Sequence, residues 1–445
     1  MANRLLIIGG VAAGAKAAAV ARRRDPSARI VLVQDESSIS YSACGLPYWI
    51  SQDEGIERRR LVARTPEAFG HDGIEVRTWQ RVEALDVARA TARICETASG
   101  RSYEEPYDSV LLATGARSIP LDVPRVGATP AVVYLRSIAD ADHIMHSLPG
   151  MQRAVIVGGG YIGLEMAEAL LRRGLGVCVV EMMPRLLPNF AEAIGEAALA
   201  ALRQHGAEVL TGQRVVGLDG GRVMLGDGTA LAADVVLAAM GVRPRTELAT
   251  AAGVALGATG AIAVSAGMQT SAAQVYAAGD CVQSTHLLTK APVWMPLGDV
   301  ASRQARVAAV NMTGGDAAFP GVLGTAIFRV FDLAVARTGL SHAQALAAGL
   351  DPVTELVEAP SRARYMRGSR ALKIALTVQR GSGRVLGGEV SGEDAVDKTV
   401  DILATAIWGG LRAADLVDLD LAYAPPFSPV LAPVQLAGDV LRKMA

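Results

Sequence analysis

The 445-residue sequence has little cysteine, few aromatic residues and no long run of one charge. Its four cysteines, Cys44, Cys95, Cys178 and Cys281, form no CxxC or CxxxxC pair, which argues against a zinc site and against a vicinal dithiol. We therefore expect no metal centre. The formal net charge is −1, so nothing in the charge pattern favours binding to nucleic acid or to an anionic membrane.

Long apolar runs are also missing. No stretch reaches the roughly 18 apolar residues that a membrane-spanning helix needs, so we expect no integral membrane segment. A few scattered thiols in an alanine-rich chain fit the reducing cytosol, and we expect a cytoplasmic protein. What is present is a hydrophobic fraction of 51% and a charged fraction of 20%, typical of globular domains. At about 150 residues per domain, the length predicts two or three of them.

One sequence pattern occurs twice in the chain. "RLLIIGGVAAGAKAAAVARR" near the start and "RAVIVGGGYIGLEMAEALLRRG" near the middle each combine an apolar run, a glycine turn and a helical stretch. Each is followed by a second apolar run, "ARIVLVQDE" or "LGVCVVEMM". The pattern predicts two strand–turn–helix–strand units of parallel sheets with right-handed crossovers. One such unit binds one dinucleotide, so two units predict two bound dinucleotides.

The second copy matches the dinucleotide fingerprint G-x-G-x-x-G at Gly158, Gly160 and Gly163. These glycines permit the tight turn, the approach of a pyrophosphate and the close packing of helix on strand. Glu181 ends the next strand, where a carboxylate accepts from ribose hydroxyls and repels a 2′-phosphate. We therefore expect NADH to be preferred over NADPH.

The first copy is degenerate. Gly9 and Gly14 hold the outer glycine positions, Val11 takes the middle one, and Gln34 stands at the strand end where an acid is usual. Two further segments, "VLLATGARSIP" and "VVLAAMGVRPRTEL", each read as a buried strand that ends in a glycine turn. "QVYAAGDCV" ends in Gly279 and Asp280, where an aspartate can accept from a sugar-like hydroxyl of a cofactor.

Together these segments resemble the FAD-dependent pyridine nucleotide–disulfide oxidoreductases, along the whole chain. "SYSACGLPYWI" and the late "YAPPFSP" resemble the group of coenzyme A disulfide reductases and NADH oxidases or peroxidases, which carry one redox cysteine. The resemblance implies an α/β fold with two Rossmann-like domains and a C-terminal α+β dimerisation domain. We predict an FAD-binding domain over 1–113 and 245–320, an NADH-binding domain over 114–244 and the dimerisation domain over 321–445.

The same resemblance implies two cofactors, FAD and NADH, and a homodimer. Tyr161 would cover the nicotinamide side of the flavin until NADH binds, with Glu165 close by. The predicted cofactor-binding residues are Gly9, Val11, Ala12, Ala13, Gly14, Gln34, Ala113, Thr114, Gly115, Gly158, Gly160, Tyr161, Ile162, Gly163, Glu165, Glu181, Gly241, Gly279, Asp280 and Leu297.

Cys44 is the redox cysteine that the resemblance implies. It would lie against the flavin before a helix whose N-terminus favours a thiolate, the form that attacks a disulfide. For the other three cysteines we predict small, unreactive side chains. Tyr423 and Tyr365 match the two tyrosines that the partner subunit places near the sulfur. Arg23, Ser40 and Ser302 match positions that contact coenzyme A in the group.

The sequence also departs from the group. Alanine at Ala43, serine at Ser302 and leucine at Leu431 replace expected substrate contacts, so the catalytic part is intact while the part that selects the thiol is changed. We predict an NADH:disulfide oxidoreductase with coenzyme A disulfide as leading substrate. An NADH oxidase, a quinone or polysulfide reductase, and a flavin-based redox sensor remain alternatives. The first glycine loop lacks the histidine of the oxidase and peroxidase members, which argues against peroxide chemistry.

Overall fold

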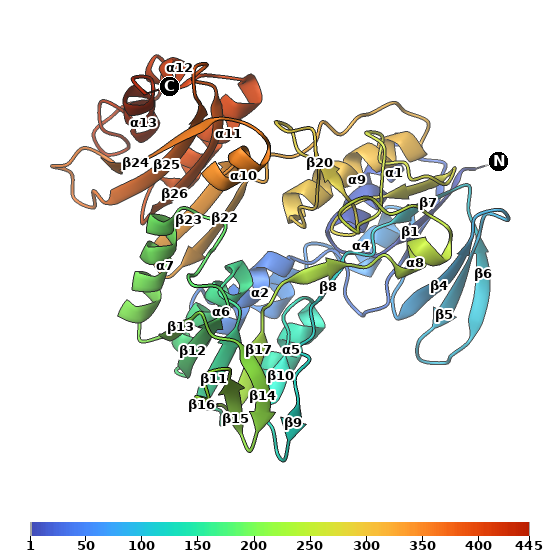
Figure 1. Cartoon of the computed structure of the whole chain (residues 1–445). Coiled ribbons are helices and arrows are strands. Elements are labelled where there is room, and N and C mark those ends of the chain that lie inside the picture. The colour runs from blue at the N-terminus through green and yellow to red at the C-terminus, as the bar shows by residue number, and fades with distance from the viewer. Residues whose placement is uncertain (1, 445) are drawn as a thin grey trace.

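The computed structural model describes residues 2–444, which form three sheet-based domains (Figure 1). The first contains a five-stranded parallel sheet in the order β19-β7-β1-β2-β3. Its strands are β1 (Arg4–Ile8), β2 (Arg29–Val33), β3 (Ile74–Arg77), β7 (Ser109–Leu112) and β19 (Val275–Ala277).

The two faces of this sheet are covered differently, because alternate strand residues point to opposite sides. Leu5 and Ile7 pack on helices α1 (Ala12–Arg24) and α9 (Gly298–Met312). Leu6 and Ile8 pack on a small antiparallel sheet of β4 (Gln80–Asp86), β5 (Thr91–Glu96) and β6 (Ser102–Pro106). The glycine turn after β1 is left at the carboxyl edge of the sheet, facing outward.

The second domain repeats this plan. Its parallel sheet has the order β10-β17-β11-β12-β13, formed by β10 (Ala131–Val133), β11 (Arg153–Val157), β12 (Gly176–Glu181), β13 (Glu208–Thr211) and β17 (Val235–Ala238). One face packs on α5 (Ile138–Ser147), α6 (Tyr161–Arg172) and α7 (Glu192–Gln204). The other packs on a small sheet of β9 (Arg125–Val126), β14 (Val215–Asp219), β15 (Arg222–Leu225) and β16 (Ala230–Ala232).

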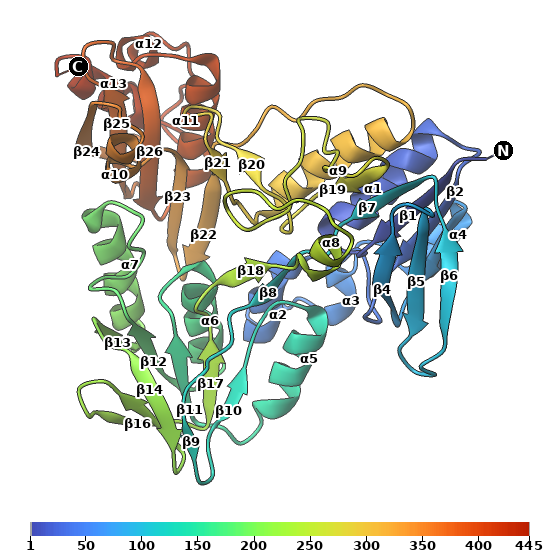
Figure 2. The same ribbon diagram turned by 45° about the vertical axis from the view of Figure 1, so that its right-hand side comes forward.

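The third domain is an antiparallel sheet whose main core lies between one face of the sheet and a group of helices. Its order is β22-β23-β26-β25-β24, from β22 (Ala326–Val330), β23 (Leu333–Gly339), β24 (Pro352–Pro360), β25 (Ala371–Gln379) and β26 (Val385–Gly392). Helices α11 (Val396–Gly409), α12 (Ala413–Val417) and α13 (Pro433–Leu441) complete its core, and α10 (His342–Ala347) follows β23. In Figure 2 this domain lies above the second domain, with the first to their side.

Short elements connect these domains. The strands β8 (Ala116–Ser118) and β18 (Val242–Pro244) pair antiparallel where the chain passes between the first two domains. The remaining elements are η1 (Ala43–Gly45), α2 (Leu46–Ser51), α3 (Arg58–Leu61), α4 (Pro66–His71), α8 (Glu247–Ala251), β20 (Ser284–Thr285) and β21 (Pro292–Val293).

The predicted fold class is confirmed: both glycine-turn units form parallel sheets, and the last third is α+β. The two small sheets, β4–β6 and β9 with β14–β16, were not predicted, because their short strands carry mixed polar residues with weak alternation. The domain boundaries stay predictions. Within residues 2–444, no helix combines the length and the apolarity that crossing a membrane requires.

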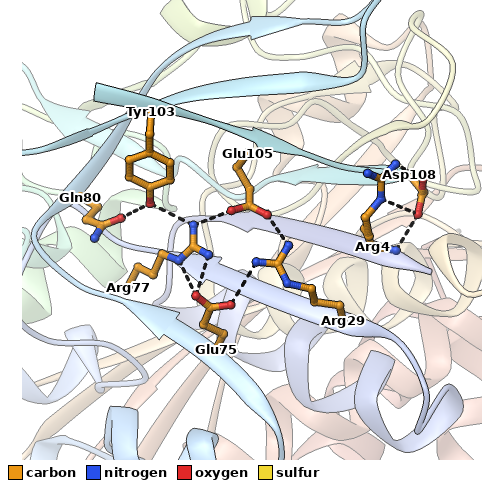
Figure 3. Close-up of polar contacts among 8 residues, drawn as sticks. All are labelled: Arg4, Arg29, Glu75, Arg77, Gln80, Tyr103, Glu105 and Asp108. Carbon is orange, nitrogen blue, oxygen red and sulfur yellow. Dashed lines mark hydrogen bonds and ion pairs between the residues drawn. The ribbon is translucent and has the colours of Figure 1, made fainter. Parts of the chain in front are cut away.

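A polar network joins the parallel sheet of the first domain to its small sheet (Figure 3). The Arg77 guanidinium donates to Glu105 at 2.7 Å and to the Tyr103 hydroxyl at 2.9 Å, and it pairs with Glu75 at 2.6 Å. Arg29 pairs with both Glu105 and Glu75. Burial alone would raise the pKa of the Glu105 carboxyl, but hydrogen bonds from Arg29 and Arg77 hold it below its ordinary value.

We expect Glu105→Gln to lower the free energy of unfolding by about 2 kcal/mol, because Arg77 and the half-exposed Arg29 both lose a largely buried partner. Since folding lowers this pKa, the stabilisation is complete above the ordinary value and disappears as the pH falls through the folded-state value. Urea unfolding followed by circular dichroism measures the change. The matched control is Glu104→Gln on the same strand, whose exposed carboxylate pairs with Arg89 at 3.5 Å, and its effect should stay below about 0.5 kcal/mol. Equal losses in the two variants would contradict this reading.

Candidate active site

The first glycine turn is shaped by close backbone contacts. Gly9 has a φ of +100°, and a Cβ there would lie 2.2 Å from the Ala113 carbonyl oxygen. A Cβ on Gly14 would lie 1.7 Å from the Gly9 carbonyl oxygen, so helix α1 can pack this closely on β1 only with glycine at that position. The free N–H groups at the start of α1 are thereby held at the carboxyl edge of the sheet, as anion binding requires.

The second glycine turn has the same geometry. Gly158 has a φ of +115°, and its Cβ would lie 2.4 Å from the Ala239 carbonyl oxygen. A Cβ on Gly163 would lie 2.0 Å from the Gly158 carbonyl oxygen. Gly160 is the N-cap of α6, and Ile162 packs against the core of the second domain.

The residue at the end of the second strand holds each turn. The Gly10 N–H donates to Gln34 Oε1 at 2.7 Å, and the Gly159 N–H donates to Glu181 Oε2 at 2.6 Å. The other oxygen of Glu181 accepts from the Met183 N–H at 2.7 Å. A carboxylate has about four acceptor positions, so Glu181 keeps capacity for ribose hydroxyls, while the amide oxygen of Gln34 has less.

A cavity of about 770 Å³ lies at the carboxyl edge of the first sheet. It brings together most of the residues predicted for the flavin side: Gly9, Val11, Ala12, Ala13, Gln34, Cys44, Ala113, Thr114, Gly115, Gly279 and Asp280. Gly14 is buried behind the turn. Leu297 does not line the cavity, although its neighbours Pro296 and Gly298 do. The size, the helix N-terminus and the hydroxyl acceptors fit a dinucleotide such as FAD.

Cys44 opens into this cavity. It lies in η1, directly before the six-residue helix α2, and its side chain is exposed. Desolvation by the surrounding cavity walls nevertheless raises the pKa of the Cys44 thiol. The Glu165 carboxyl raises it further, and Arg136 lowers it. The expectation of a thiolate stabilised by the next helix is therefore wrong for the chain by itself, because desolvation and a nearby acid outweigh a short helix.

The other cysteines do not reach this cavity. Cys178 is buried in β12, where burial raises its pKa to about 12. Cys281 is fully buried, with its thiol 3.5 Å from the Leu112 and Ala278 carbonyl oxygens. Cys95 lies in β5, on the small sheet. Of the four cysteines, all among the described residues, Cys44 is the one that lines the cavity.

Arg136 is a cavity residue that the sequence reasoning missed. It precedes α5 in the second domain, and its guanidinium pairs with the Asp280 carboxylate of the first. The Trp294 indole N–H donates to the Asp280 carbonyl oxygen at 2.8 Å. A fixed cation in the cavity suits a pyrophosphate. Its sequence signal was the capping box of Ser137 and Asp140, which marks the start of a helix just after Arg136.

Tyr161 and Glu165 lie on helix α6, outside this cavity. The Tyr161 ring stacks on Phe328 with centroids 4.7 Å apart, and it meets Phe190 edge-on at 6.0 Å. The Tyr48 hydroxyl, on α2 just after Cys44, lies 3.5 Å from Glu165 Oε1. Burial raises the pKa of Glu165 to about 7. Gly241 also lies outside the cavity, and its carbonyl oxygen accepts from the Ile119 N–H at 3.0 Å.

The predicted substrate residues are not gathered around Cys44 within one chain. Ser40 is the nearest in sequence, and its N–H donates to the Gly10 carbonyl oxygen at 2.8 Å. Arg23 is exposed on α1, and Ser302 lies on α9, which packs against α1. Tyr365 and Tyr423 are 78% and 50% exposed on the third domain. No cluster of metal-ligating side chains occurs among residues 2–444.

Two glycine-turn domains, a cavity suited to a dinucleotide and a thiol in its wall define a class of protein: flavin- and nicotinamide-dependent oxidoreductases. The chain belongs to the pyridine nucleotide–disulphide oxidoreductase family, whose model matches residues 3–305. The dimerisation domain of the same family matches residues 325–433. FAD and NAD(P)H are the cofactors of this family, and the chain is an NAD(P)H-dependent flavoprotein that acts on sulfur compounds.

Relatives of this chain carry different names. An NADH oxidase from Methanocaldococcus jannaschii is 34% identical, covering 99% of each chain. A coenzyme A disulfide reductase from Staphylococcus epidermidis is 26% identical, covering 98% of this chain and 99% of the relative. A solved structure of an NAD-dependent persulfide reductase from A. fulgidus matches with a TM-score of 0.95 and 39% identity, over 99% of this chain and 83% of that one.

We expect Glu165→Gln to change how stability depends on pH. Because the folded chain raises the pKa of this carboxyl to about 7, the wild type binds an extra proton when folded and loses stability as the pH rises from about 4.5 to 7. The variant lacks this loss, so its melting temperature relative to wild type should be higher at pH 8 than at pH 5. The control is Glu196→Gln, which makes the same change on the exposed face of α7. A difference in melting temperature between Glu165→Gln and wild type that stays constant with pH would contradict the raised pKa of Glu165.

Proposed function

We propose that this chain is an NADH:disulfide reductase in which Cys44 is the nucleophile and coenzyme A disulfide is the leading substrate. The observation that carries the proposal is the position of Cys44, an exposed thiol in the wall of the cavity that fits FAD. The other cysteines do not line this cavity, and Cys178 and Cys281 are buried, which leaves Cys44 as the sulfur for exchange.

FAD, when bound, supplies a two-electron carrier between NADH and the sulfur. The Cys44 thiolate attacks one sulfur of a disulfide RSSR, so that a Cys44–S–S–R bond forms and RS⁻ leaves. Two electrons then cleave this mixed disulfide, which returns Cys44 and releases a second RS⁻. With two protons the balance is NADH + H⁺ + RSSR → NAD⁺ + 2 RSH. Since the chain itself raises the pKa of Cys44, Arg136 is the cation that favours its thiolate form.

Tyr423 and Tyr365 are proposed to act on the Cys44 of a partner subunit. Both phenols are exposed on the third domain, and Tyr423 lines a shallow hollow there with Phe427. A matched dimerisation domain supports a homodimer, in which these tyrosines could protonate the departing thiolate. A cytoplasmic location is proposed with this function, because free thiols of a redox cysteine persist in reducing compartments.

The substrate contacts are proposed on the outer face of the first domain. Helix α1 carries exposed Lys16 and Arg23, and the neighbouring α9 carries exposed Arg306 together with Ser302. Cations on two adjacent helices suit the phosphates of a nucleotide thiol such as coenzyme A. They would compensate for leucine at Leu431, where the group usually has lysine.

The first test is anaerobic NADH oxidation with coenzyme A disulfide, counting the thiols released by the wild type and by Cys44→Ser. We expect two thiols per NADH from the wild type and a loss of at least about 100-fold in the variant, because the nucleophile is removed. Cys281→Ser serves as the control and should keep most of the activity, since Cys281 is fully buried and does not line the cavity. Pantethine disulfide, which lacks the nucleotide, tests whether the phosphates are recognised.

Other results would replace this proposal. NADH turnover with oxygen or a quinone that survives Cys44→Ser would favour an oxidase or quinone reductase, as the name of the M. jannaschii relative suggests. Turnover with polysulfide but not with coenzyme A disulfide would favour a persulfide reductase. Failure of NADH to bleach the flavin would favour a redox sensor.

The preference for NADH over NADPH is proposed from Glu181. Its carboxylate ends β12 beside the second glycine turn, and the exposed Met182 and Met183 that follow carry no charge to neutralise a 2′-phosphate. We expect kcat/KM for NADH to exceed that for NADPH by ~tenfold or more, because like charges repel in this partly dry site. Glu181→Ala combined with Met182→Arg should reverse the ratio in steady-state assays. Equal use of both nucleotides by the wild type would contradict this reading.

A further inference from the structure

Tyr161 stands where the second glycine turn meets its helix. It is the first residue of α6 and follows Gly160 directly. Glu165 lies four residues further on, and residues four apart share one face of a helix. This face is turned towards α2, because Glu165 Oε1 lies 3.5 Å from the hydroxyl of Tyr48, four residues after Cys44. The Tyr161 side chain therefore projects from the side of α6 that faces the first domain.

The route of the nicotinamide passes this side of α6. A dinucleotide bound to such a unit lays its pyrophosphate at the helix N-terminus and its adenosine ribose at the strand end, here Glu181. For hydride transfer, the nicotinamide half has to extend from the pyrophosphate to the cavity of the first domain, where Cys44 lies. Tyr161 comes directly after the turn at which this half departs. The position of its ring thus decides whether the route is open.

Two buried aromatic rings hold the Tyr161 ring. It stacks on Phe328 with centroids 4.7 Å apart and an interplanar angle of 28°, and it meets Phe190 edge-on at 6.0 Å. Phe328 lies on β22, and Phe190 lies in the segment before α7; they are 5% and 3% exposed. Held in this way, Tyr161 does not line the cavity. We term Phe328 and Phe190 the aromatic dock.

The third domain fixes both rings of the aromatic dock. Phe328 belongs to that domain, and Arg337 on β23 donates to the carbonyl oxygen of the residue before Phe190 at 2.9 Å. The Arg337 guanidinium also lies over the Phe190 ring, 5.3 Å from its centroid. Glu389 on β26 accepts from the N–H of the residue after Phe190. In Figure 2, β22 and β23 reach towards α6 and α7, and these elements share one hydrophobic core.

We propose that Phe328 is a positioning residue for NADH binding: by stacking on Tyr161, it holds that ring clear of the route of the nicotinamide. A Tyr161 ring released from the aromatic dock would occupy space that the nicotinamide needs. The affinity for the nucleotide then scales with the fraction of molecules in which the ring is docked. The inference needs a nicotinamide nucleotide in the second domain, and it does not depend on Cys44 or on which disulfide is reduced.

The test is the dissociation constant of NAD⁺, measured by isothermal titration calorimetry on the FAD-loaded protein. We expect Phe328→Leu to weaken NAD⁺ binding by about fivefold, because leucine keeps an apolar contact but loses an aromatic pair of ordinary strength. In anaerobic stopped-flow reduction of the flavin, the apparent dissociation constant for NADH should rise by the same factor. The limiting rate should stay unchanged, whereas a general loss of structure would lower it.

Two further variants separate the action of Phe328 through Tyr161 from a structural role. Tyr161→Ala removes the ring that the aromatic dock holds, so adding Phe328→Leu to it should have no further effect on NAD⁺ binding. Phe331→Leu is the matched control. Phe331 directly follows β22, is also 5% exposed, and stacks on His205 of the second domain. Its replacement should leave the NAD⁺ dissociation constant unchanged.

Three results would overturn the proposal: unchanged or tighter NAD⁺ binding in Phe328→Leu, a loss that persists when Tyr161 is alanine, or an equal loss in Phe331→Leu. The last would assign the effect to the packing of the third domain on the second. If Phe328→Leu does not fold, judged by circular dichroism, Phe190→Leu removes the other ring of the aromatic dock and decides by the same measurements. Since NAD⁺ binding needs no disulfide, a failure of the proposed disulfide reduction would leave these results unaffected.

Discussion

The close approach of helix and strand at the two glycine turns is the constraint on which the rest of this molecule depends. Neither Gly14 nor Gly163 can carry a side chain, because a Cβ would lie 2.0 Å or less from a backbone oxygen. The approach fixes where each helix begins and aims its free N–H groups at the sheet edge. The strand-end residue then braces the turn from the other side, through Gln34 in one domain and Glu181 in the other. Everything that gathers at these edges, including Cys44, depends on that geometry.

The two dinucleotide domains are connected through charge as well as through the chain. Arg136 of the second domain pairs with Asp280 of the first, inside the cavity. Glu165 of the second domain raises the pKa of Cys44 and lies beside Tyr48, on the helix that follows this cysteine. The protonation of the sulfur is therefore set by both domains together. An enzyme that moves electrons from a nicotinamide to a thiol gains from such a link, because a change of charge on one side is felt at the other.

The sequence could predict the parts of this structure that local rules determine. Continuous apolar runs and glycine turns identified both parallel sheets, and the fingerprint at Gly158 identified the second dinucleotide unit. Sequence reasoning missed Arg136, because its place in the cavity follows from segments far apart in the chain. It also gave the wrong direction for the pKa of Cys44, since the nearby helix was visible in the sequence while the desolvating walls and Glu165 were not. A pKa that depends on charges and burial contributed by distant segments cannot be predicted from local sequence patterns.

The departures from the coenzyme A disulfide reductase pattern have a physical logic of their own. Ala43, Ser302 and Leu431 are places where a polar or charged contact is replaced, and none of them belongs to the glycine turns, although Ala43 lies beside Cys44 in the cavity wall. Leu431 is exposed on the third domain, 42% of its surface open, so the loss of lysine there removes a flexible surface cation rather than a fixed one. Lys16, Arg23 and Arg306 instead put positive charge on two packed helices of the first domain, which hold their positions better than a loop does. Under the proposed function, recognition of the thiol would thus fall to the first domain, while Cys44 stays in place as the reacting sulfur.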